Sequence, residues 1–254
     1  MSATRSASTK VPAIKIGLDG AALVVCGYGN GHAGANGRWQ ALGRAAGFSE
    51  TVHATLFGQP RIEEVVASLD GAPIVVVPLL MARGVTHRVL SDRLSALPHA
   101  DRVVLCPELG SHPGLARRVA AHAGEELRRL DWRHEETGLL LVGHGSPRNA
   151  ASQTSTARLA KEIEDLALFA ETSAAFLEER PTVQDARRAC SARQVLAIGC
   201  FAEAGRHATR DVPKCLTQSG RPTAYSGPIG ACDWIDSLVL DQALAGLRGT
   251  EASQ

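Results

Sequence analysis

Residues 139–149 read LLLVGHGSPRN, an apolar run that ends at His144 between two glycines. A short continuous apolar run predicts a strand buried on both faces, as in a parallel sheet. Residues 150–168 then repeat apolar positions with the period of a helix, and Pro147 and Asn149 suit its first turn. In open sheets of this kind, ligands bind beyond the carboxyl ends of the strands. His144 is therefore a candidate site residue, and its flanking glycines would let a substrate approach the backbone.

Further short apolar runs alternate with helical patterns on both sides of this segment. They lie at residues 22–26 (ALVVC), 74–77 (IVVV) and 102–106 (RVVLC), and then at 173–176 (SAAF), 195–198 (VLAI) and 223–226 (TAYS). Strands of this kind separated by helices predict an α/β protein whose parallel sheets are covered on both faces.

The two halves of the chain also resemble each other. Gly-x-Gly follows the first strand of each half, at residues 27–29 and 143–145. PELG at 107–110 and GPIG at 227–230 each precede an amphipathic helix. A repeat offset of roughly 120 residues indicates an internal duplication. We therefore expect two similar Rossmann-like lobes, residues 16–133 and 134–254, after a disordered tail at 1–15.

The composition excludes several classes of protein. A net charge of +1 gives no general attraction to nucleic acid or to a membrane surface. No apolar run is long enough to span a bilayer, and the start of the chain does not read as a secretory signal. None of the six cysteines forms a C-x-x-C pair, so we expect neither structural zinc nor an iron–sulfur cluster. A disulfide framework is not expected in a chain of this length, so we expect reduced thiols in a cytoplasmic protein.

A second histidine follows a later strand of the second half. Residues 199–213 read GCFAEAGRHATRDVP and contain His207. The expected strand order 2-1-3-4 makes the strands before His144 and His207 neighbours, about 5 Å apart. Glu178 or Glu179, after residues 173–176, would reach the same space. Two histidines and a glutamate suit a divalent cation. The alternatives are that His144 caps the helix or bonds a nearby carbonyl, that His207 is a solvated surface residue, and that the glutamates lie in a solvated turn.

Basic side chains cluster in the same segments, at Arg148, Arg206, Arg210 and Lys214. Arginines of this kind would bind the carboxylates of an anionic substrate, which the nearly neutral chain cannot attract by net charge. An ordinary solvated surface is the alternative for any one of them.

The motifs GHGS, AFLE (residues 175–178) and AGRHATRDVP, in this order and at these distances, resemble the sirohydrochlorin chelatases of the CbiX type. PELGSHPGL and GPIGACDWI fit the same pattern. The resemblance implies a chelatase of two lobes with a cleft between them for the macrocycle. It assigns the metal to His144 and His207, and an acidic role, less directly, to Glu178.

The first half departs from that pattern. Tyr28 stands where the motif histidine would be, His87 is one residue out of register with His207, and His32 is off position. We therefore expect one active site, built on the second half and roofed by the first. Arg83, His87 and Arg88 would contribute contacts to the substrate carboxylates.

The resemblance implies ATP-independent insertion of a divalent metal into sirohydrochlorin, for siroheme or cobalamin synthesis, by a monomer or homodimer. Fe²⁺ is favoured over Co²⁺ because cobalt-linked relatives carry a His-rich tract and a cysteine-rich tail, which this chain lacks. The metal would be a substrate, and no G-x-x-x-x-G-K-[ST] motif indicates a nucleotide. A tetrapyrrole or metal carrier without catalysis is the alternative. A serine hydrolase based on Ser146 is disfavoured, because the G-x-S-x-G elbow is missing.

Overall fold

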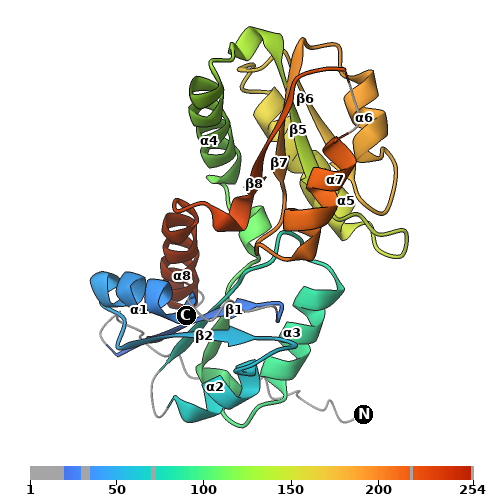
Figure 1. Cartoon of the computed structure of the whole chain (residues 1–254). Coiled ribbons are helices and arrows are strands. Elements are labelled where there is room, and N and C mark those ends of the chain that lie inside the picture. The colour runs from blue at the N-terminus through green and yellow to red at the C-terminus, as the bar shows by residue number, and fades with distance from the viewer. Residues whose placement is uncertain (1–19, 30–34, 70–72, 218–219, 253–254) are drawn as a thin grey trace, which may run out of the picture.

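The computed structural model describes residues 20–29, 35–69, 73–217 and 220–252, so the expected tail at 1–15 and His32 lie outside the described residues. The described part of the chain forms two four-stranded parallel sheets, stacked end to end in Figure 1. The first has the order β2-β1-β3-β4 and the second β6-β5-β7-β8. Both confirm the predicted order, with the first strand of each half next to the third.

The strands of the first sheet are β1 (Ala22–Gly27), β2 (Glu50–Thr55), β3 (Ile74–Pro78) and β4 (Val103–Leu105). Those of the second are β5 (Thr137–Gly143), β6 (Glu171–Phe176), β7 (Gln194–Gly199) and β8 (Thr223–Pro228). Strand β2 was not among the predicted strands, because its sequence, ETVHAT, alternates polar and apolar residues and contains no apolar run.

The helices are α1 (Ala35–Ala46), α2 (Ile62–Ser68), α3 (Val85–Ser95), α4 (Leu115–Leu130), α5 (Ala151–Glu164), α6 (Val183–Ala189), α7 (Val212–Leu216) and α8 (Ile235–Ala252). Short 3₁₀ turns occur at Ala100–Arg102, Leu109–Ser111, His134–Glu136 and Ile229–Ala231. A π-helical turn, His207–Asp211, leads into α7. The helix predicted at 150–168 thus begins as expected and ends earlier, at Glu164.

Each sheet is apolar on both faces, as continuous apolar strands require. In β1, Leu23 and Val25 join a core shared with α1, α4, α5 and α8, whereas Val24 and Cys26 pack with α2 and α3. Successive strand residues point to opposite faces, so one strand serves two helix layers. The shared core also contains residues of β5, and it therefore joins the two halves.

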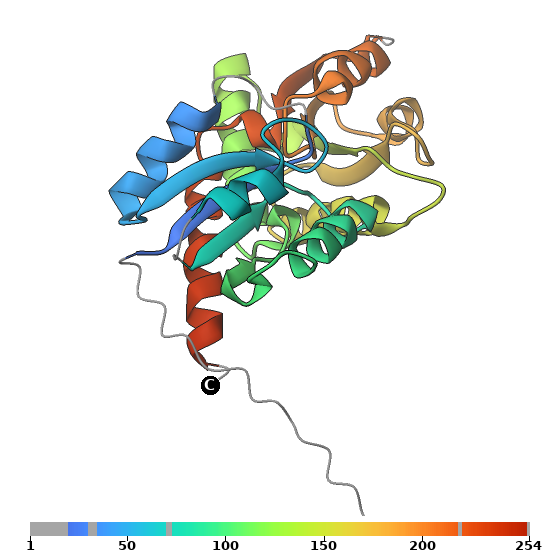
Figure 2. The ribbon, with the colours of Figure 1, turned by 90° about the horizontal axis from the view of Figure 1, so that it is seen from below.

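The last helix of each half packs on the sheet of the other half. Helix α8 contacts α1, β3 and β4, and α4 contacts α5 and β7. Figures 1 and 2 show α8 beside the first sheet, whereas the strands that precede it in sequence form the second sheet. We call β1–β4 with α1, α2, α3 and α8 the first lobe, and β5–β8 with α4–α7 the second lobe. The division of the sequence into two repeats at residue 133 stays a prediction. In the folded chain, α4 of the first half packs on the second sheet and α8 of the second half packs on the first sheet.

Equivalent contacts support the duplication. Gly110 donates its N–H to the carbonyl of Leu80 over 3.0 Å, and Gly230 donates to the carbonyl of Phe201 over 2.9 Å. A Cβ at either glycine would lie 1.9 Å from a carbonyl oxygen, of Met81 or Ala202 respectively. The repeated PELG and GPIG segments therefore end in glycine because the backbone of the preceding loop packs directly against it.

The described helices include none with both the length and the hydrophobicity needed to cross a membrane. All six cysteines fall within the described ranges, and all are free thiols, as the sequence predicted.

Candidate metal-insertion site

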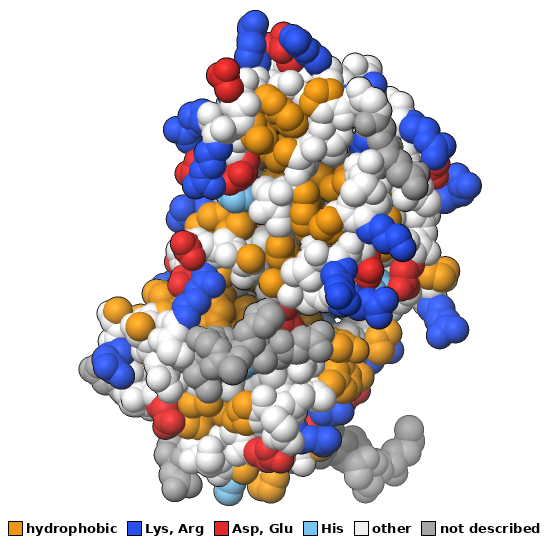
Figure 3. Space-filling view, in the orientation of Figure 1, with side chains coloured by type: hydrophobic (Ala, Val, Ile, Leu, Met, Phe, Trp, Pro, Cys, Tyr) orange, Lys and Arg blue, Asp and Glu red, His pale blue; other side chains and the backbone are white. Residues whose placement is uncertain are grey.

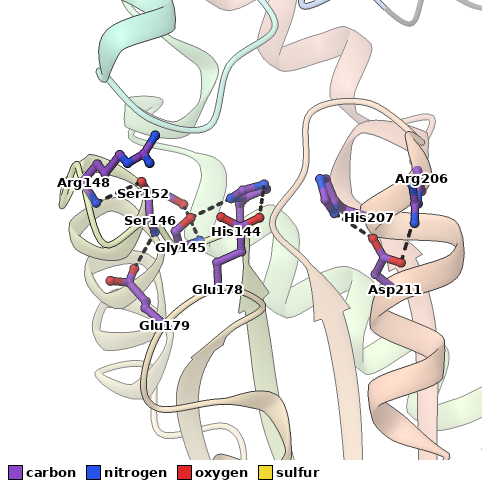
Figure 4. Close-up of polar contacts among 10 residues, drawn as sticks. All are labelled: His144, Gly145, Ser146, Arg148, Ser152, Glu178, Glu179, Arg206, His207 and Asp211. Carbon is purple, nitrogen blue, oxygen red and sulfur yellow. Dashed lines mark hydrogen bonds and ion pairs between the residues drawn. The ribbon is translucent and has the colours of Figure 1, made fainter.

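The two histidines singled out by the sequence lie side by side. His144 follows β5 and His207 follows the neighbouring strand β7. Their ring centroids are 4.6 Å apart, and the ring planes are almost perpendicular, at 88°. Figure 4 shows the two rings above the ends of the strands, pointing toward the space under the other lobe. The predicted strand order thus brings both imidazoles to one volume.

The loop around His144 is fixed by its own backbone and by Glu179. Gly145 has φ +72, and a Cβ there would lie 2.8 Å from Cγ of Glu179 and 2.9 Å from Cβ of Phe176. The Glu179 carboxylate accepts the N–H of Ser146 over 3.1 Å. The glycine is therefore needed for the left-handed backbone and for close packing. Glu179 and Phe176 fill the space on the side where a Cβ would lie, while Gly145 still lines the cavity, so the approach of a substrate to this backbone stays a prediction.

Both histidine rings have their Nδ1 engaged. Nδ1 of His144 lies 2.6 Å from the carbonyl oxygen of Gly145. Nδ1 of His207 lies 2.8 Å from Oδ2 of Asp211. A carbonyl or a carboxylate can only accept, so Nδ1 carries the hydrogen in each ring, and in the neutral form Nε2 keeps a lone pair. The site therefore offers two nitrogen donors suited to a metal ion or a proton.

Glu178, and not Glu179, lies beside His144. Its Oε1 lies 3.6 Å from Nε2 of His144, and its side chain is half exposed. Glu179 is occupied at the Ser146 backbone, as described above. Among the described residues no group of three His, Cys, Asp or Glu side chains is arranged to hold a metal ion.

A cavity of about 560 Å³ opens between the lobes in front of these histidines. The second lobe contributes His144, Ser146, Phe201, Glu203 and His207 to its wall. The first lobe contributes Tyr28 and the loop that runs from Leu79 to the start of α3. The family resemblance implied such a cleft, and we expected the first half to cover the site on the second.

The predicted basic residues divide into two groups. Arg206 lines the cavity, and its Nε lies 3.9 Å from Oδ1 of Asp211. Arg148, Arg210 and Arg83 are exposed and do not line the cavity. Figure 3 shows Lys and Arg side chains gathered at the lower edge of the second lobe, near the junction with the first. Of these four arginines, only Arg206 thus lies in the wall of the cavity.

His87 lies away from the cavity. Only 7% of it is exposed, and its Nε2 has no hydrogen-bond partner among the described residues. Burial lowers the pKa of His87 below its usual value, an effect that the nearby Glu108 carboxylate opposes. The structure does not support the expected contact with substrate carboxylates, because a neutral ring enclosed by protein cannot reach them.

Sequence reasoning missed two side chains of the site. Asp211, four residues after His207, orients that ring; its i, i+4 spacing on a helical turn was the available signal. Glu203 accepts the N–H of Tyr28 across the cleft over 2.9 Å. No motif indicated this contact, because the two residues are 175 positions apart.

Comparison with known proteins agrees with the repeated architecture. The CbiX family model matches residues 22–126 and 138–245, one segment in each half. The chain belongs to the CbiX family. Tyr28 occupies the position after β1 that His144 occupies after β5, so this CbiX chain presents its histidine pair from the second half.

Relatives of known name are similar over most of the chain. A Halobacterium salinarum protein named "probable sirohydrochlorin cobaltochelatase" is 25% identical over 233 residues, covering 77% of this chain and 80% of that protein. A solved CbiX structure, described as the terminal enzyme for siroheme biosynthesis in denitrifying bacteria, has a TM-score of 0.66 and 24% identity, covering 88% of this chain and 98% of that one. SirB of Bacillus subtilis with Fe³⁺ has a TM-score of 0.70 and 17% identity, covering 91% and 97%. The two structures establish the likeness of fold.

Proposed function

We propose that this protein is a sirohydrochlorin chelatase, which exchanges two pyrrole N–H protons for a divalent metal ion. The observation that carries the proposal is the pair of imidazoles, 4.6 Å apart, each with Nδ1 engaged and Nε2 left for other ligands. They face a cleft between the lobes of a CbiX-family chain. The Halobacterium relative, named for this chemistry, supports the same activity.

His144 and His207 hold the incoming metal through Nε2. Metal–imidazole bonds are about 2.1 Å long, so one ion can bind two rings at this separation. Neutral imidazole suits both iron and cobalt. Because the protein supplies few ligands, pyrrole nitrogens replace the remaining ligands one after another while the ion is still held.

The two displaced protons need acceptors close to the macrocycle. An imidazole that has released the metal is a suitable base near neutral pH. Glu178, 3.6 Å from Nε2 of His144, takes a proton from that ring and passes it to solvent, since its carboxylate is half exposed. The balance is one metal ion bound for two protons released, and it requires no nucleotide.

The finer proposal is that the metal is Fe²⁺, because the printed sequence contains no His-rich tract of the kind that the family resemblance associates with cobalt. The name of the Halobacterium relative favours cobalt instead. Anaerobic assays with equal Fe²⁺ and Co²⁺, followed by separation of the two products, decide between them. An excess of the cobalt product would overturn the iron proposal and leave the chelatase proposal intact.

The activity itself is tested with purified protein, sirohydrochlorin and either metal under anaerobic conditions. We expect the absorption spectrum of free sirohydrochlorin to convert to that of the metal complex, faster than without protein and with many turnovers. A spectrum that changes only in proportion to the protein added, without turnover, would identify a carrier and contradict the proposal.

A further inference from the structure

Large hydrophobic side chains on the first lobe gather at the cleft. Among the described residues, the exposed large hydrophobics are Tyr28, Phe57, Val85, Leu130 and Leu168. Tyr28 and Val85 line the cavity, and the ring of Phe57 packs against Tyr28 with 4.9 Å between centroids and 55° between planes. Exposed apolar groups in such a cluster are typical of a binding surface.

This aromatic pair is held firmly by the first lobe. Phe57 donates its N–H to the carbonyl of Tyr28 over 2.9 Å. The guanidinium of Arg93 lies over the Phe57 ring, 5.2 Å from its centroid. Arg93 is itself fixed, because it donates to the carbonyl of Leu56 over 2.7 Å and pairs with Glu63 at 3.2 Å. These contacts join the loops of Tyr28 and Phe57 and cover one face of the Phe57 ring.

Two glycines allow the two loops to approach each other. Gly29 has φ +153, and a Cβ on Gly58 would lie 2.3 Å from its carbonyl oxygen. Any larger side chain at Gly58 would separate the loops that carry Tyr28 and Phe57. From the other lobe, Glu203 accepts the Tyr28 N–H and so fixes the tyrosine relative to the loop of His207.

We propose that Tyr28, backed by Phe57, is the surface on which one face of the tetrapyrrole macrocycle packs while His144 and His207 deliver metal to the other face. The proposal rests on the proposed function. A tetrapyrrole has flat apolar faces and carboxylates at its edge. The cleft offers both kinds of contact, with the aromatic side chains of Tyr28 on the first lobe and Phe201 on the second, and with Arg206 also in the wall. Tyr28, at the position that His144 occupies in the other half, thus contacts the substrate directly.

The test is binding of metal-free sirohydrochlorin, followed by its absorption and fluorescence as protein is added. An aromatic contact of this kind contributes modestly, so Tyr28→Ala is expected to weaken binding by roughly threefold to tenfold. Tyr28→Phe keeps the ring and is expected to stay within about twofold of the parent. Phe57→Ala removes the ring that packs against Tyr28, and its affinity for sirohydrochlorin is expected to lie between those of Tyr28→Ala and Tyr28→Phe.

Leu168→Ala is the matched control, because Leu168 and Tyr28 are both 48% exposed and Leu168 does not line the cavity. Equal affinity of Tyr28→Ala and Leu168→Ala would overturn the inference. So would a change of oligomeric state in Tyr28→Ala with unchanged affinity, which would make the aromatic pair a contact between protein copies. Failure of the parent itself to bind sirohydrochlorin would refute the proposed function instead. Far-UV circular dichroism establishes that each variant is folded.

Discussion

Asp211 and His207 form a side-chain pair on one π-helical turn, with 2.8 Å between Oδ2 of the aspartate and Nδ1 of the histidine. The carboxylate fixes which ring nitrogen carries the hydrogen and points Nε2 away from its own turn. Partners of this kind, behind a metal-binding histidine, strengthen it as a ligand. A half-exposed histidine ring in a loop can usually rotate. The contact with Asp211 explains how the His207 ring keeps one orientation at the cleft.

We therefore predict that Asp211→Ala lowers metal affinity or turnover by roughly 10- to 100-fold. Asp211→Asn should lose less, because its amide oxygen still accepts the Nδ1 hydrogen without supplying charge. Metal titration and steady-state assays measure both effects. The matched control is Asp241→Ala, which removes another aspartate paired with a histidine, 3.9 Å from Nε2 of His112 and outside the cavity. An equal loss in both alanine variants would mean that Asp211 acts only through general charge.

A second prediction separates the histidine from the serine of the same loop. His144→Ala is expected to reduce insertion to near the uncatalysed rate, because one of two metal donors is lost. Ser146→Ala should retain most activity, since among the described residues the one hydrogen bond of the Ser146 hydroxyl is accepted from the backbone N–H of Arg148, over 3.3 Å. Both side chains are partly exposed, so the free energy of unfolding should change little in either variant. Activity that depends on Ser146 and survives loss of His144 would point to the hydrolase alternative.

The sequence predicted the histidine pair because two strong patterns agreed. Apolar runs located β5 and β7, and the handedness and order rules for parallel sheets made them neighbours. The side chains around the pair were harder to predict. Whether Glu178 or Glu179 faces His144 depends on how the chain turns after Phe176, and adjacent residues give no periodic signal in a loop.

The sequence could not predict that α4 and α8 each pack on the sheet of the other half, and the reason is different. An amphipathic stripe indicates that a helix is covered, but not by which sheet. Burial of Leu238, Val239 and Leu247 is worth roughly 1.5–3 kcal/mol per side chain wherever their apolar partner lies. Two similar sheets offer similar partners, so only the lengths and directions of the connections decide the arrangement.

A third prediction concerns pH and stability. Burial lowers the pKa of His53, His87, His112 and His122 below the usual value of 6.5. These rings take up protons at higher pH in the unfolded chain than in the folded one. The contribution of these neutral histidines to the stability of the folded state is therefore fully present above pH 6.5, and it is lost as the pH falls through their folded-state pKa values. We expect urea unfolding to show lower stability at about pH 5.5 than at about pH 7.5.

The variant that checks this cause is His87→Asn, because the His87 ring is buried with an unpaired Nε2. It removes one proton-binding group, so the difference between the two pH values should become smaller, whatever its effect on stability at either pH. An unchanged difference would mean that other groups, the carboxylates first, govern the pH response.

The last prediction tests which arginine contacts the substrate carboxylates. Arg206 lines the cavity, while Arg210, one helical turn later on the same segment, does not. An exposed ion pair is worth about 1 kcal/mol, so Arg206→Ala should raise KM roughly fivefold, and Arg210→Ala should leave it within about twofold. The difference should shrink between about 50 mM and about 500 mM salt, since screening weakens the contact in the parent. A fall in kcat with unchanged KM would instead mean that Arg206 acts by holding Asp211, 3.9 Å away. If neither parameter changes, the carboxylates bind elsewhere on the rim, and Arg83 and Arg88, both exposed on the first lobe, become the residues to replace.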